Sequence, residues 1–394
     1  MSNITFKLNN DEAIIGLCGR VDSTNAADLE NGIKNYLNSN PHTSLTADLE
    51  KLEYISSAGL RVILRLCKDE KKFCLINASS EVYEILEMTG FTEMIPVKKA
   101  YRRISVDGCE IIGRGAMGTV YRLDEDIIVK VYNESVSPDD INRERELARK
   151  AFVLGIPTAI PFDVVKVGNA YGSVFELLKA KSFAELIIAA PAELDKYIDL
   201  SVELMKTIHS TAVRENDLPA FKNKAVGTAQ KLKAFLPADK AEKFRKMAEA
   251  IPDTNTMVHG DLHIKNIMMQ NGEILLIDMD TLGRGHPVFE FEAIFQAYIA
   301  YSEIDKNNTC DFFGIRYETA EKIWKETLRR YFRDKDEAYI AEISDKISLL
   351  GYASLFCWFI GENANPEGYE KALTDAYMKR ILELIDKVDG FEFE

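Results

Sequence analysis

The chain has 394 residues, of which 46% are hydrophobic and 28% are charged, and its formal net charge at pH 7 is −14. This length and composition indicate a globular protein of two or three domains and exclude a disordered or fibrous chain. The excess of acidic residues argues against nucleic acid or an anionic membrane as the main partner, because both require a basic surface.

The sequence shows no signal for export and no membrane span. The first residues include acidic side chains and lack the basic cap of a secretory signal. No apolar run approaches the roughly 18–20 residues that cross a bilayer. The six cysteines form no C-x-x-C pair and have no histidine partners at zinc spacing. We therefore expect reduced thiols in a cytoplasmic protein.

The first segment, residues 1–98, alternates between strand-like and helix-like patterns. Short apolar runs are bounded by turn residues, whereas "SSAGLRVILRLCKDEKK" places apolar residues at helical spacing. The expected strands are 13–19, 44–50 and 73–78, and the expected helices are 56–72 and 80–90. Such alternation predicts an α/β domain with a sheet covered by helices.

The remaining segment, residues 99–394, begins with strands and continues with helices. The expected strands are 103–113, 118–124, 126–132, 162–168 and 171–178, with a helix at 140–155. Helices dominate from Ser182 onward, interrupted by residues 257–280, where Asn271-Gly272 predicts a tight hairpin turn. We predict a β-rich lobe at 99–178 and a helical lobe at 179–394, with a ligand cleft between them.

A glycine-rich stretch opens the β-rich lobe. In "IIGRGAMGTVYRL" three glycines lie between two strand-like runs, and glycine allows both close approach to a phosphate and a positive φ. A glycine-rich hairpin alone would give the same pattern. However, Lys130 follows in the apolar run "IIVKVY", and lysine is rarely buried without a partner. Glycine loop, strand, turn and strand with lysine is the order of a kinase nucleotide lobe.

The next helix offers an acidic partner for this lysine. In "NRERELARKAF", Glu144 shares the face of the apolar residues, whereas Glu146 points the other way. Glu144 is therefore the expected partner and Glu146 the alternative.

The stretches "HGDLHIKN" (259–266) and "LLIDMD" (275–280) hold the candidate chemistry. A helical zinc clip would need Glu after His259, where the chain has glycine, and the EF-hand calcium pattern fails at its later positions. An ordinary polar loop would not predict the upstream glycines and lysine. Phosphoryl transfer needs a carboxylate to orient a hydroxyl and oxygen ligands for Mg²⁺, and these segments supply both.

Residues 104–394 resemble the aminoglycoside phosphotransferase and choline kinase branch of the protein-kinase-like fold. The loop "HGDLHIKN" is similar to that branch's H-G-D-x-x-x-x-N motif, and "LLIDMD" to its I-D-x-D segment. The resemblance implies a bilobal α+β domain that moves the γ-phosphate of ATP, with Mg²⁺, to a hydroxyl acceptor. It implies that Asp261 is the catalytic base, that Asn266 and Asp278 bind Mg²⁺, and that Asp280 lies nearby.

The resemblance also implies the residues around the nucleotide and shows two departures. The implied ATP-binding residues are Gly113, Gly115, Gly118, Val120, Lys130 and Glu144, with Glu176 and Leu178 at a hinge that would receive adenine. The glycine-rich loop is closer to that of protein kinases than to that of many drug-modifying relatives. In addition, "GHPVFEF" has Glu290 where the family commonly has Asp.

Residues 1–98 resemble a STAS domain, the fold of anti-sigma-factor antagonists. The resemblance rests on "GRVDSTNAADL" and "DLEKLEYISSAGLRVIL". In that family a serine that opens a helix is phosphorylated, and the aligned residue is Ser57, although the usual preceding Asp is Ser56 here. Free N–H groups and the helix dipole would favour a phosphate there. Alternatively, Ser56 only caps the helix.

Three functions follow from these resemblances. The first is an ATP- and Mg²⁺-dependent phosphotransferase with a small hydroxyl-bearing acceptor and a STAS domain that regulates or docks a protein partner. The second is a protein serine kinase that acts on Ser57 or on a partner's STAS serine, although no A-P-E segment follows Asp280. The third is a non-catalytic nucleotide-sensing scaffold, which the complete set of site residues disfavours.

Overall fold

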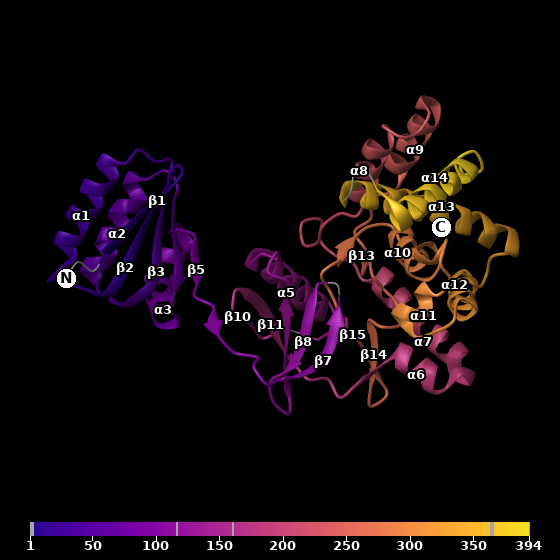
Figure 1. Ribbon diagram of the computed structural model, residues 1–394, viewed down its shortest axis with the longest axis horizontal. Coiled ribbons are helices and arrows are strands. Elements are labelled where there is room, and N and C mark those ends of the chain that lie inside the picture. Colours follow the sequence, from indigo (N-terminus) through magenta and orange to yellow (C-terminus); the bar gives the residue numbers. More distant parts are fainter. Residues whose placement is uncertain (1–3, 116, 160, 363–365, 394) are drawn as a thin grey trace. The chain divides into compact units, whose positions relative to one another are not determined.

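The computed structural model describes residues 4–115, 117–159, 161–362 and 366–393. The chain divides into two compact units, each with its own hydrophobic core. The first unit comprises Met1–Ser105 and Val165–Gly168, and the second comprises Val106–Val164 and Asn169–Glu394 (Figure 1).

The first unit contains one mixed sheet in the order β1-β2-β3-β4-β5. Its strands are β1 (Ile4–Asn9), β2 (Glu12–Val21), β3 (Ser44–Ile55), β4 (Phe73–Ala78) and β5 (Val97–Lys99). The first pair is antiparallel and the following pairs are parallel. Parallel neighbours require crossover connections, which in this unit contain helices.

Helices pack against this sheet (Figure 1). They are α1 (Ala26–Ser39), α2 (Ser57–Asp69), α3 (Ser80–Met88) and the short α4 (Phe91–Met94). The α2 helix buries Val62, Ile63 and Leu66 and begins after Ser56, whose Oγ accepts the Ala58 N–H at 3.2 Å. The expected α/β class is therefore confirmed.

The elements β1 and α1, and the short elements α4 and β5, were not predicted from the sequence. In β1 every residue after Ile4 is exposed, so the strand lacks the buried alternation that marks an edge strand as part of a sheet. In α1 only Ala26, Leu29 and Ile33 are buried among polar residues, which leaves a narrow apolar stripe.

We expect Ser56→Ala to destabilise the chain and Ser57→Ala to leave its stability nearly unchanged. Ser56 satisfies an N–H at the start of α2, and losing such a cap typically costs about 1 kcal/mol of unfolding free energy. Ser57 is exposed at the first helical position. Calorimetric melting of the two variants beside the wild type measures the difference, and equal melting temperatures would contradict the cap assignment.

The β-rich part of the second unit is an antiparallel meander. Its elements are β7 (Glu110–Gly115), β8 (Gly118–Arg122), β9 (Ile127–Tyr132), α5 (Pro138–Val153), β10 (Asp163–Val167) and β11 (Ala170–Glu176). The strand order within this unit is β11-β9-β8-β7. The strand β6 (Arg102–Arg103) and residues Val165–Val167 of β10 belong to the first unit. The central strand β9 therefore pairs with β8 on one side and β11 on the other.

The strand expected at 103–113 is shorter in the structure. Residues 104–109 form no strand, because Gly108 has a φ of 78° and the Cys109 N–H bonds to the Val106 carbonyl in a turn. The Asp107-Gly108 pair is a common turn signal, and it ends the apolar run before the strand β7 begins.

The rest of the second unit is mainly helical. Its helices are α6 (Phe183–Ala189), η1 (Pro191–Glu193), α7 (Leu194–Ser210), α8 (Lys222–Leu232), α9 (Ala238–Ala250), α10 (Val288–Tyr298), η2 (Ala300–Ser302), α11 (Asn308–Phe313), α12 (Tyr317–Tyr331), α13 (Glu337–Glu362) and α14 (Gly368–Leu384). Its strands are β12 (Lys181–Ser182), β13 (Met257–Val258), β14 (Ile267–Gln270), β15 (Glu273–Leu276) and β16 (Gly283–Arg284). A β-rich part followed by a helical part confirms the expected α+β class.

One helix, α13, is long and apolar enough by length and composition to cross a membrane. The most apolar 18-residue window of the stretch Glu337–Gly361 has a mean hydropathy of 1.2, and 61% of that window is buried inside the protein. Its buried residues Ile347, Leu350 and Ala353 belong to the same core as α10. The helix is therefore packed as the core helix of a globular domain.

Candidate active site

Lys130 lies at the centre of the β-rich part, on the strand β9. Its backbone is opposite Val120 of β8 and Ser173 of β11. Its Nζ atom is 3.2 Å from Glu144 Oε1 and 2.8 Å from Asp278 Oδ1. Burial opposes the charge of the ammonium, but these two carboxylates hold the pKa of Lys130 above its ordinary value.

The helix α5 presents Glu144, and not Glu146, to Lys130. Glu144 is buried, and its second oxygen accepts the hydroxyl of Tyr132 at 2.7 Å. Glu146 is exposed and has Arg149 as its neighbour at 3.5 Å. The helical spacing in the sequence therefore identified the side chain that faces the sheet.

The glycine-rich hairpin joins β7 to β8, with Gly115 opposite Gly118 and Gly113 opposite Val120. Ala116 lies outside the described residues. None of the three glycines has a positive φ. Gly118 is required for a different reason, because a Cβ there would lie 2.1 Å from the Val131 carbonyl oxygen. A Cβ on Gly115 would meet no atom within 4 Å.

We expect Gly118→Ala to destabilise the second unit and Gly115→Ala to leave its stability unchanged. The first substitution forces the backbones of β8 and β9 apart, which costs about 1–3 kcal/mol or more. The second adds a methyl group to open space. Chemical denaturation measures both effects. If both variants unfold at the same denaturant concentration as the wild type, the close approach of Gly118 to the Val131 carbonyl does not constrain the fold.

The loop 259–266, called the HGD loop below, joins Asp261 to Asn266 through side-chain hydrogen bonds. The Asn266 amide donates to both the backbone carbonyl and Oδ2 of Asp261 at 2.9 Å. The Ile277 N–H donates to the Asn266 carbonyl at 3.0 Å, which aligns the loop with the segment that carries Asp278. Burial, together with the charge of Asp278, raises the pKa of Asp261 to about 7.

The two histidines of the HGD loop are buried and uncharged at neutral pH. Burial lowers the pKa of His259, and it lowers that of His263 to about 4. His259 Nδ1 accepts the Asp261 N–H at 3.2 Å, which fixes the loop. His263 Nε2 lies 3.6 Å from Asp261 Oδ1, and its ring packs edge-on against Phe312 and Phe313.

Asp278 and Asp280 follow the hairpin of β14 and β15. The turn residues Asn271 and Gly272 both have positive φ, as an Asn-Gly hairpin requires. Asp278 itself has a φ of 66°, which is uncommon for a non-glycine residue and directs its carboxylate toward Lys130. Burial and the neighbouring Asp278 raise the pKa of Asp280 to about 6.

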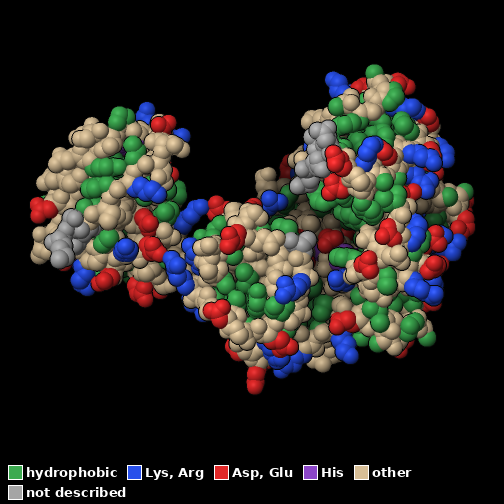
Figure 2. All heavy atoms as spheres, in the orientation of Figure 1, with side chains coloured by type: hydrophobic (Ala, Val, Ile, Leu, Met, Phe, Trp, Pro, Cys, Tyr) green, Lys and Arg blue, Asp and Glu red, His purple; other side chains and the backbone are tan. Residues whose placement is uncertain are grey.

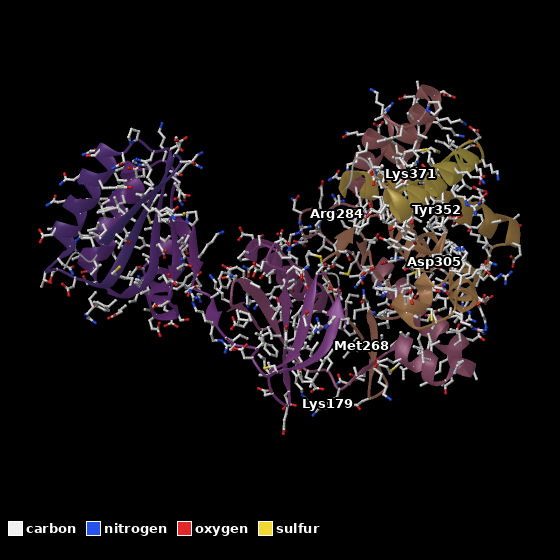
Figure 3. All side chains as sticks on the ribbon, viewed as in Figure 1. Lys179, Met268, Arg284, Asp305, Tyr352 and Lys371 are labelled. Atoms are coloured by element: carbon white, nitrogen blue, oxygen red, sulfur yellow. The ribbon has the colours of Figure 1, made fainter. Side chains whose placement is uncertain are left out.

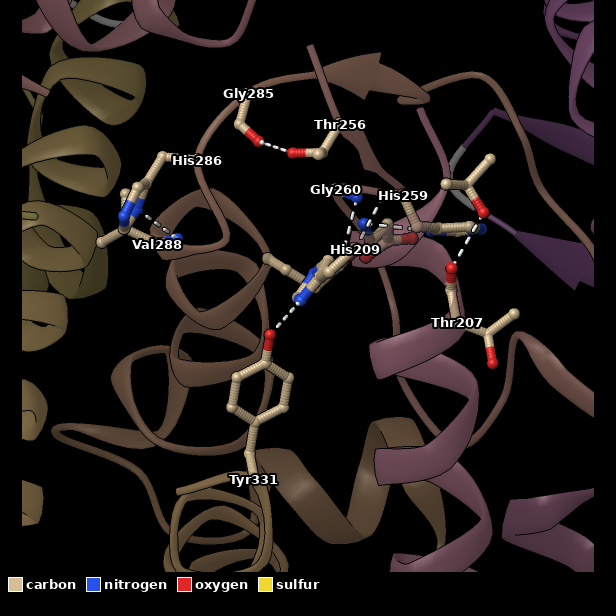
Figure 4. Close-up of polar contacts among 12 residues, drawn as sticks. Thr207, His209, Thr256, His259, Gly260, Gly285, His286, Val288 and Tyr331 are labelled. Carbon is tan, nitrogen blue, oxygen red and sulfur yellow. Dashed lines mark hydrogen bonds and ion pairs between the residues drawn. The ribbon is translucent and has the colours of Figure 1, made fainter. Parts of the chain in front are cut away.

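The structure adds Glu290 as a residue that organises the HGD loop. Its fully buried carboxylate accepts the His259 N–H at 2.7 Å and the Gly260 N–H at 3.0 Å. His209 Nε2 is 3.7 Å away, and His209 Nδ1 bonds to the Tyr331 hydroxyl (Figure 4). Burial alone would raise the pKa of Glu290, but His209 and His259 hold it below its ordinary value.

Sequence reasoning noted Glu290 only as a departure from a family pattern. The signal that could have revealed its role is an acidic residue inside the apolar run "HPVFEFEAIF", where a buried carboxylate needs hydrogen-bond donors. The loop 259–260 supplies these donors as free backbone N–H groups.

We expect Glu290→Gln to lower both the stability and the phosphoryl-transfer rate. The side-chain amide oxygen of the variant can accept only one of the His259 and Gly260 N–H groups, and its NH₂ group faces the other N–H. A buried N–H donor that loses its acceptor costs about 1–3 kcal/mol of unfolding free energy. Glu292→Gln is the matched control, because Glu292 is buried on the same helix but bonds to Gln296. Thermal melts and turnover numbers of both variants test this, and equal behaviour would contradict the anchoring role.

The remaining predicted residues line the β-rich part or lie elsewhere. Val120 is opposite Lys130, while Glu176 is exposed at the end of β11. Leu178 lies just beyond β11, next to Leu177, whose N–H donates to the Asp126 carbonyl at 2.7 Å. Ser57 belongs to the first unit and is exposed at the start of α2. Carboxylates and a histidine are visible in the hollow between the β-rich and helical parts of the second unit (Figure 2).

The donor atoms suit Mg²⁺ held jointly by protein and phosphates. Within the described part of the chain, no group of three or more His, Cys, Asp or Glu side chains could hold a metal by itself. Mg²⁺ at nucleotide sites typically has one or two carboxylates, waters and phosphate oxygens as ligands. Asn266 and Asp278 supply oxygen donors of this kind, and the fit therefore depends on a bound nucleotide.

Comparison with known proteins identifies both parts of the chain. Residues 108–324 match the phosphotransferase enzyme family, and residues 3–104 match the STAS domain. A protein of Bordetella bronchiseptica, BtrV, which is named as an anti-sigma factor antagonist, is 35% identical over 85 residues. This match covers 21% of the present chain and 72% of BtrV.

Solved structures match each part at low identity. The ADP-bound aminoglycoside phosphotransferase APH(2'')-Ib is 15% identical, with a TM-score of 0.46, over 80% of this chain and 99% of that one. An anti-sigma factor antagonist from Mycobacterium paratuberculosis is 19% identical, with a TM-score of 0.23, over 24% of this chain and 83% of that one.

The fold and the family match together define the class. The chain belongs to the phosphotransferase enzyme family and carries a STAS domain before the phosphotransferase domain. It is an ATP-dependent phosphotransferase.

Proposed function

We propose that the chain transfers the γ-phosphate of ATP, bound with Mg²⁺, to a hydroxyl group of a small molecule. The observation that carries this proposal is the pair of ionic contacts that Lys130 makes with Glu144 and Asp278. In the nearby HGD loop, the Asn266 amide donates a hydrogen bond to the Asp261 carboxylate. These are the groups that phosphoryl transfer requires for positioning and charge stabilisation. In this proposal residues 1–98 form the STAS domain and residues 99–394 form the phosphotransferase domain, with its two lobes divided after residue 178.

Each side chain has a distinct task in this mechanism. Lys130 would contact the phosphates, and Glu144 holds its ammonium in place. Mg²⁺ bound to Asn266 and Asp278 would neutralise charge on the transferred group. Asp261 would accept the proton of the acceptor hydroxyl, and its raised pKa makes it a better base than an ordinary aspartate. Asp280 would support Asp278 from the adjacent position.

The nucleotide would be held by the β-rich part. Gly113, Gly115 and Gly118 would let the backbone of the hairpin approach the phosphates closely, and Val120 would cover the base. Backbone groups from Glu176 to Leu178 would receive adenine. In this proposal the STAS domain regulates the enzyme or docks a protein partner, and the protein works in the cytoplasm without nucleic acid or membrane.

A second candidate is a protein serine kinase that acts on Ser57 or on the STAS serine of a partner. The observation that favours it is the exposure of Ser57 at the start of α2, while Ser56 is engaged as the cap. The hydroxyl of Ser57 is therefore available to a kinase. A third candidate, a nucleotide-sensing scaffold without turnover, is opposed by the intact contacts of Lys130 and Asp261.

We expect Asp261→Asn to reduce phosphoryl transfer by about 10²–10⁴-fold, the usual contribution of a general base. Nucleotide binding should change little, because Asn keeps the shape of the loop and its contact with Asn266. The measurements are ADP release with Mg²⁺-ATP and the binding of a fluorescent ATP analogue. A variant that retains the wild-type rate would refute the assignment of Asp261 as the base.

Intact mass and phosphopeptide mapping after incubation with Mg²⁺-ATP separate the candidates. Phosphate on Ser57 that disappears in both Asp261→Asn and Ser57→Ala would establish the protein-kinase function. An unmodified chain that hydrolyses ATP slowly would support the small-molecule function, and a chain that binds ATP without any hydrolysis would support the scaffold.

A further inference from the structure

The segment 300–313, from η2 to α11, lies against the HGD loop and is called the acceptor wall below. The His263 ring packs against Phe312 and Phe313 at centroid distances of 5.6 and 5.3 Å. Just before this segment, the Tyr298 hydroxyl accepts the Ile264 N–H at 3.0 Å. The wall is therefore fixed beside the loop that carries Asp261.

One cationic side chain of the HGD loop, Lys265, contacts the acceptor wall. Lys265 is exposed, and its Nζ atom lies 4.4 Å from the centre of the half-exposed Phe312 ring. The same ring contacts His263, whose Nε2 is 3.6 Å from Asp261 Oδ1. Lys265, Phe312, His263 and Asp261 thus form a continuous row. Within the described residues no carboxylate lies at ion-pair distance from the Lys265 ammonium.

The backbone around Lys265 is held on both sides. The Ile264 carbonyl accepts the Ala184 N–H at 2.9 Å, and the Asn266 N–H bonds to the His263 carbonyl at 2.9 Å. Ile264 and Asn266 are buried, whereas Lys265 between them points outward. Because His259 and His263 are neutral, Lys265 is the single positive charge among residues 259–266.

The acidic residues of the acceptor wall are largely engaged within the protein. Glu303 accepts the Tyr352 hydroxyl at 2.6 Å and the Arg380 Nε–H at 2.7 Å, so its charge is balanced. The Asp305 carboxylate accepts the Asn307 N–H at 2.9 Å. Asp305 and Tyr352 both lie in the helical part of the second unit (Figure 3). Asp305 and the exposed Asp311, which precedes Phe312, are the carboxylates of the wall that compete as charged contacts for an acceptor.

We propose that Lys265, held on the ring of Phe312, selects a hydroxyl acceptor that carries an anionic group, either carboxylate or phosphate. This inference rests on the proposed phosphotransferase function. An acceptor hydroxyl at Asp261 would place the rest of a small molecule along the row toward Lys265. An ammonium that rests on an aromatic ring forms its strongest new contact with an anion, because charge-assisted hydrogen bonds exceed neutral ones about twofold in strength.

The contact also suits discrimination between acceptors. A cationic acceptor would meet the uncompensated charge of Lys265, and such a like-charge contact disfavours binding. A neutral acceptor would lose the charge-assisted hydrogen bond but suffer no repulsion. The order of affinity expected from this site is therefore anionic first, neutral second and cationic last.

The test is the chemical protection of Lys265 by charged and neutral probes. The full-length chain, with and without Mg²⁺-ADP, is acetylated briefly in the presence of inorganic phosphate, D-glycerate, glycerol or choline. A further sample contains only a non-hydrolysable ATP analogue, and peptide mass spectrometry quantifies each lysine. Lys335, which is exposed and rests 4.8 Å from the Tyr339 ring, is the internal control. We expect phosphate and D-glycerate to slow the acetylation of Lys265 about tenfold, and glycerol and choline to leave it unchanged.

Other outcomes overturn the proposal. Equal labelling of Lys265 with every probe would show that it contacts no anion. Protection by a non-hydrolysable ATP analogue alone would assign Lys265 to the nucleotide. Because phosphate is tested with and without nucleotide, a chain that fails to bind ATP would refute the proposed function while the protection by phosphate still decides the role of Lys265.

Calorimetric titration of the variants provides the second measurement. We expect Lys265→Gln to weaken D-glycerate binding at least about tenfold, as the loss of a hydrogen bond to a charged group does. Lys265→Arg should retain the binding, because it keeps the charge, and Lys335→Gln should match the wild type. If choline binds instead and Asp305→Asn abolishes that binding, the acceptor is a cation and the proposal is wrong.

Discussion

The geometry of the site depends on one buried ammonium group shared by two carboxylates. Lys130 is separated from Glu144 by 14 residues and from Asp278 by 148, so its side chain connects the β-rich part to the segment after the HGD loop. Removing one member of such a cluster leaves an uncompensated charge in a partly buried place, which is typically very costly. Carboxyl groups outnumber ammonium groups in this cluster, because Lys130 contacts both Glu144 and Asp278. Burial and the charge of Asp278 raise the pKa values of the neighbouring Asp261 and Asp280.

The sequence predicted those parts of the fold in which one physical signal dominates. Helical spacing placed Glu144 on the inward face of its helix, and Asn271-Gly272 predicted the hairpin that brings Asp278 back toward the HGD loop. Prediction failed where tertiary contacts decide. The strand β1 has an almost fully exposed pattern and forms because β2 offers it an edge. The break at residues 104–109 has a local cause, because the expected strand 103–113 overlooked the turn signal Asp107-Gly108.

The residue types of the candidate site could be predicted from the sequence, but the distant hydrogen bonds that orient its loop could not. Asp261 and Asn266 belong to a motif, whereas the hydrogen bonds that orient the loop come from Glu290 and His259, which are 31 residues apart. A local pattern cannot reveal that an acid in an apolar helix will receive backbone N–H groups from a distant loop. The same applies to the row from Asp261 to Lys265, because Phe312 is brought there only by the packing of α11.

The hairpin of β14 and β15 has a fixed base beside the site and an exposed tip. At its base, the Ile277 N–H bonds to the Asn266 carbonyl and the Leu276 N–H bonds to the Pro157 carbonyl, so the chain is fixed where the two candidate metal ligands emerge. At its tip, Asn271 and Gly272 are exposed. Residues added at the tip would lengthen the ribbon outward and leave the register of its base intact, whereas a single residue added within either strand would reverse the facing of every side chain beyond it. The tip is therefore a natural point for attaching a reporter group or an inserted peptide without disturbing the separation of Asn266 and Asp278.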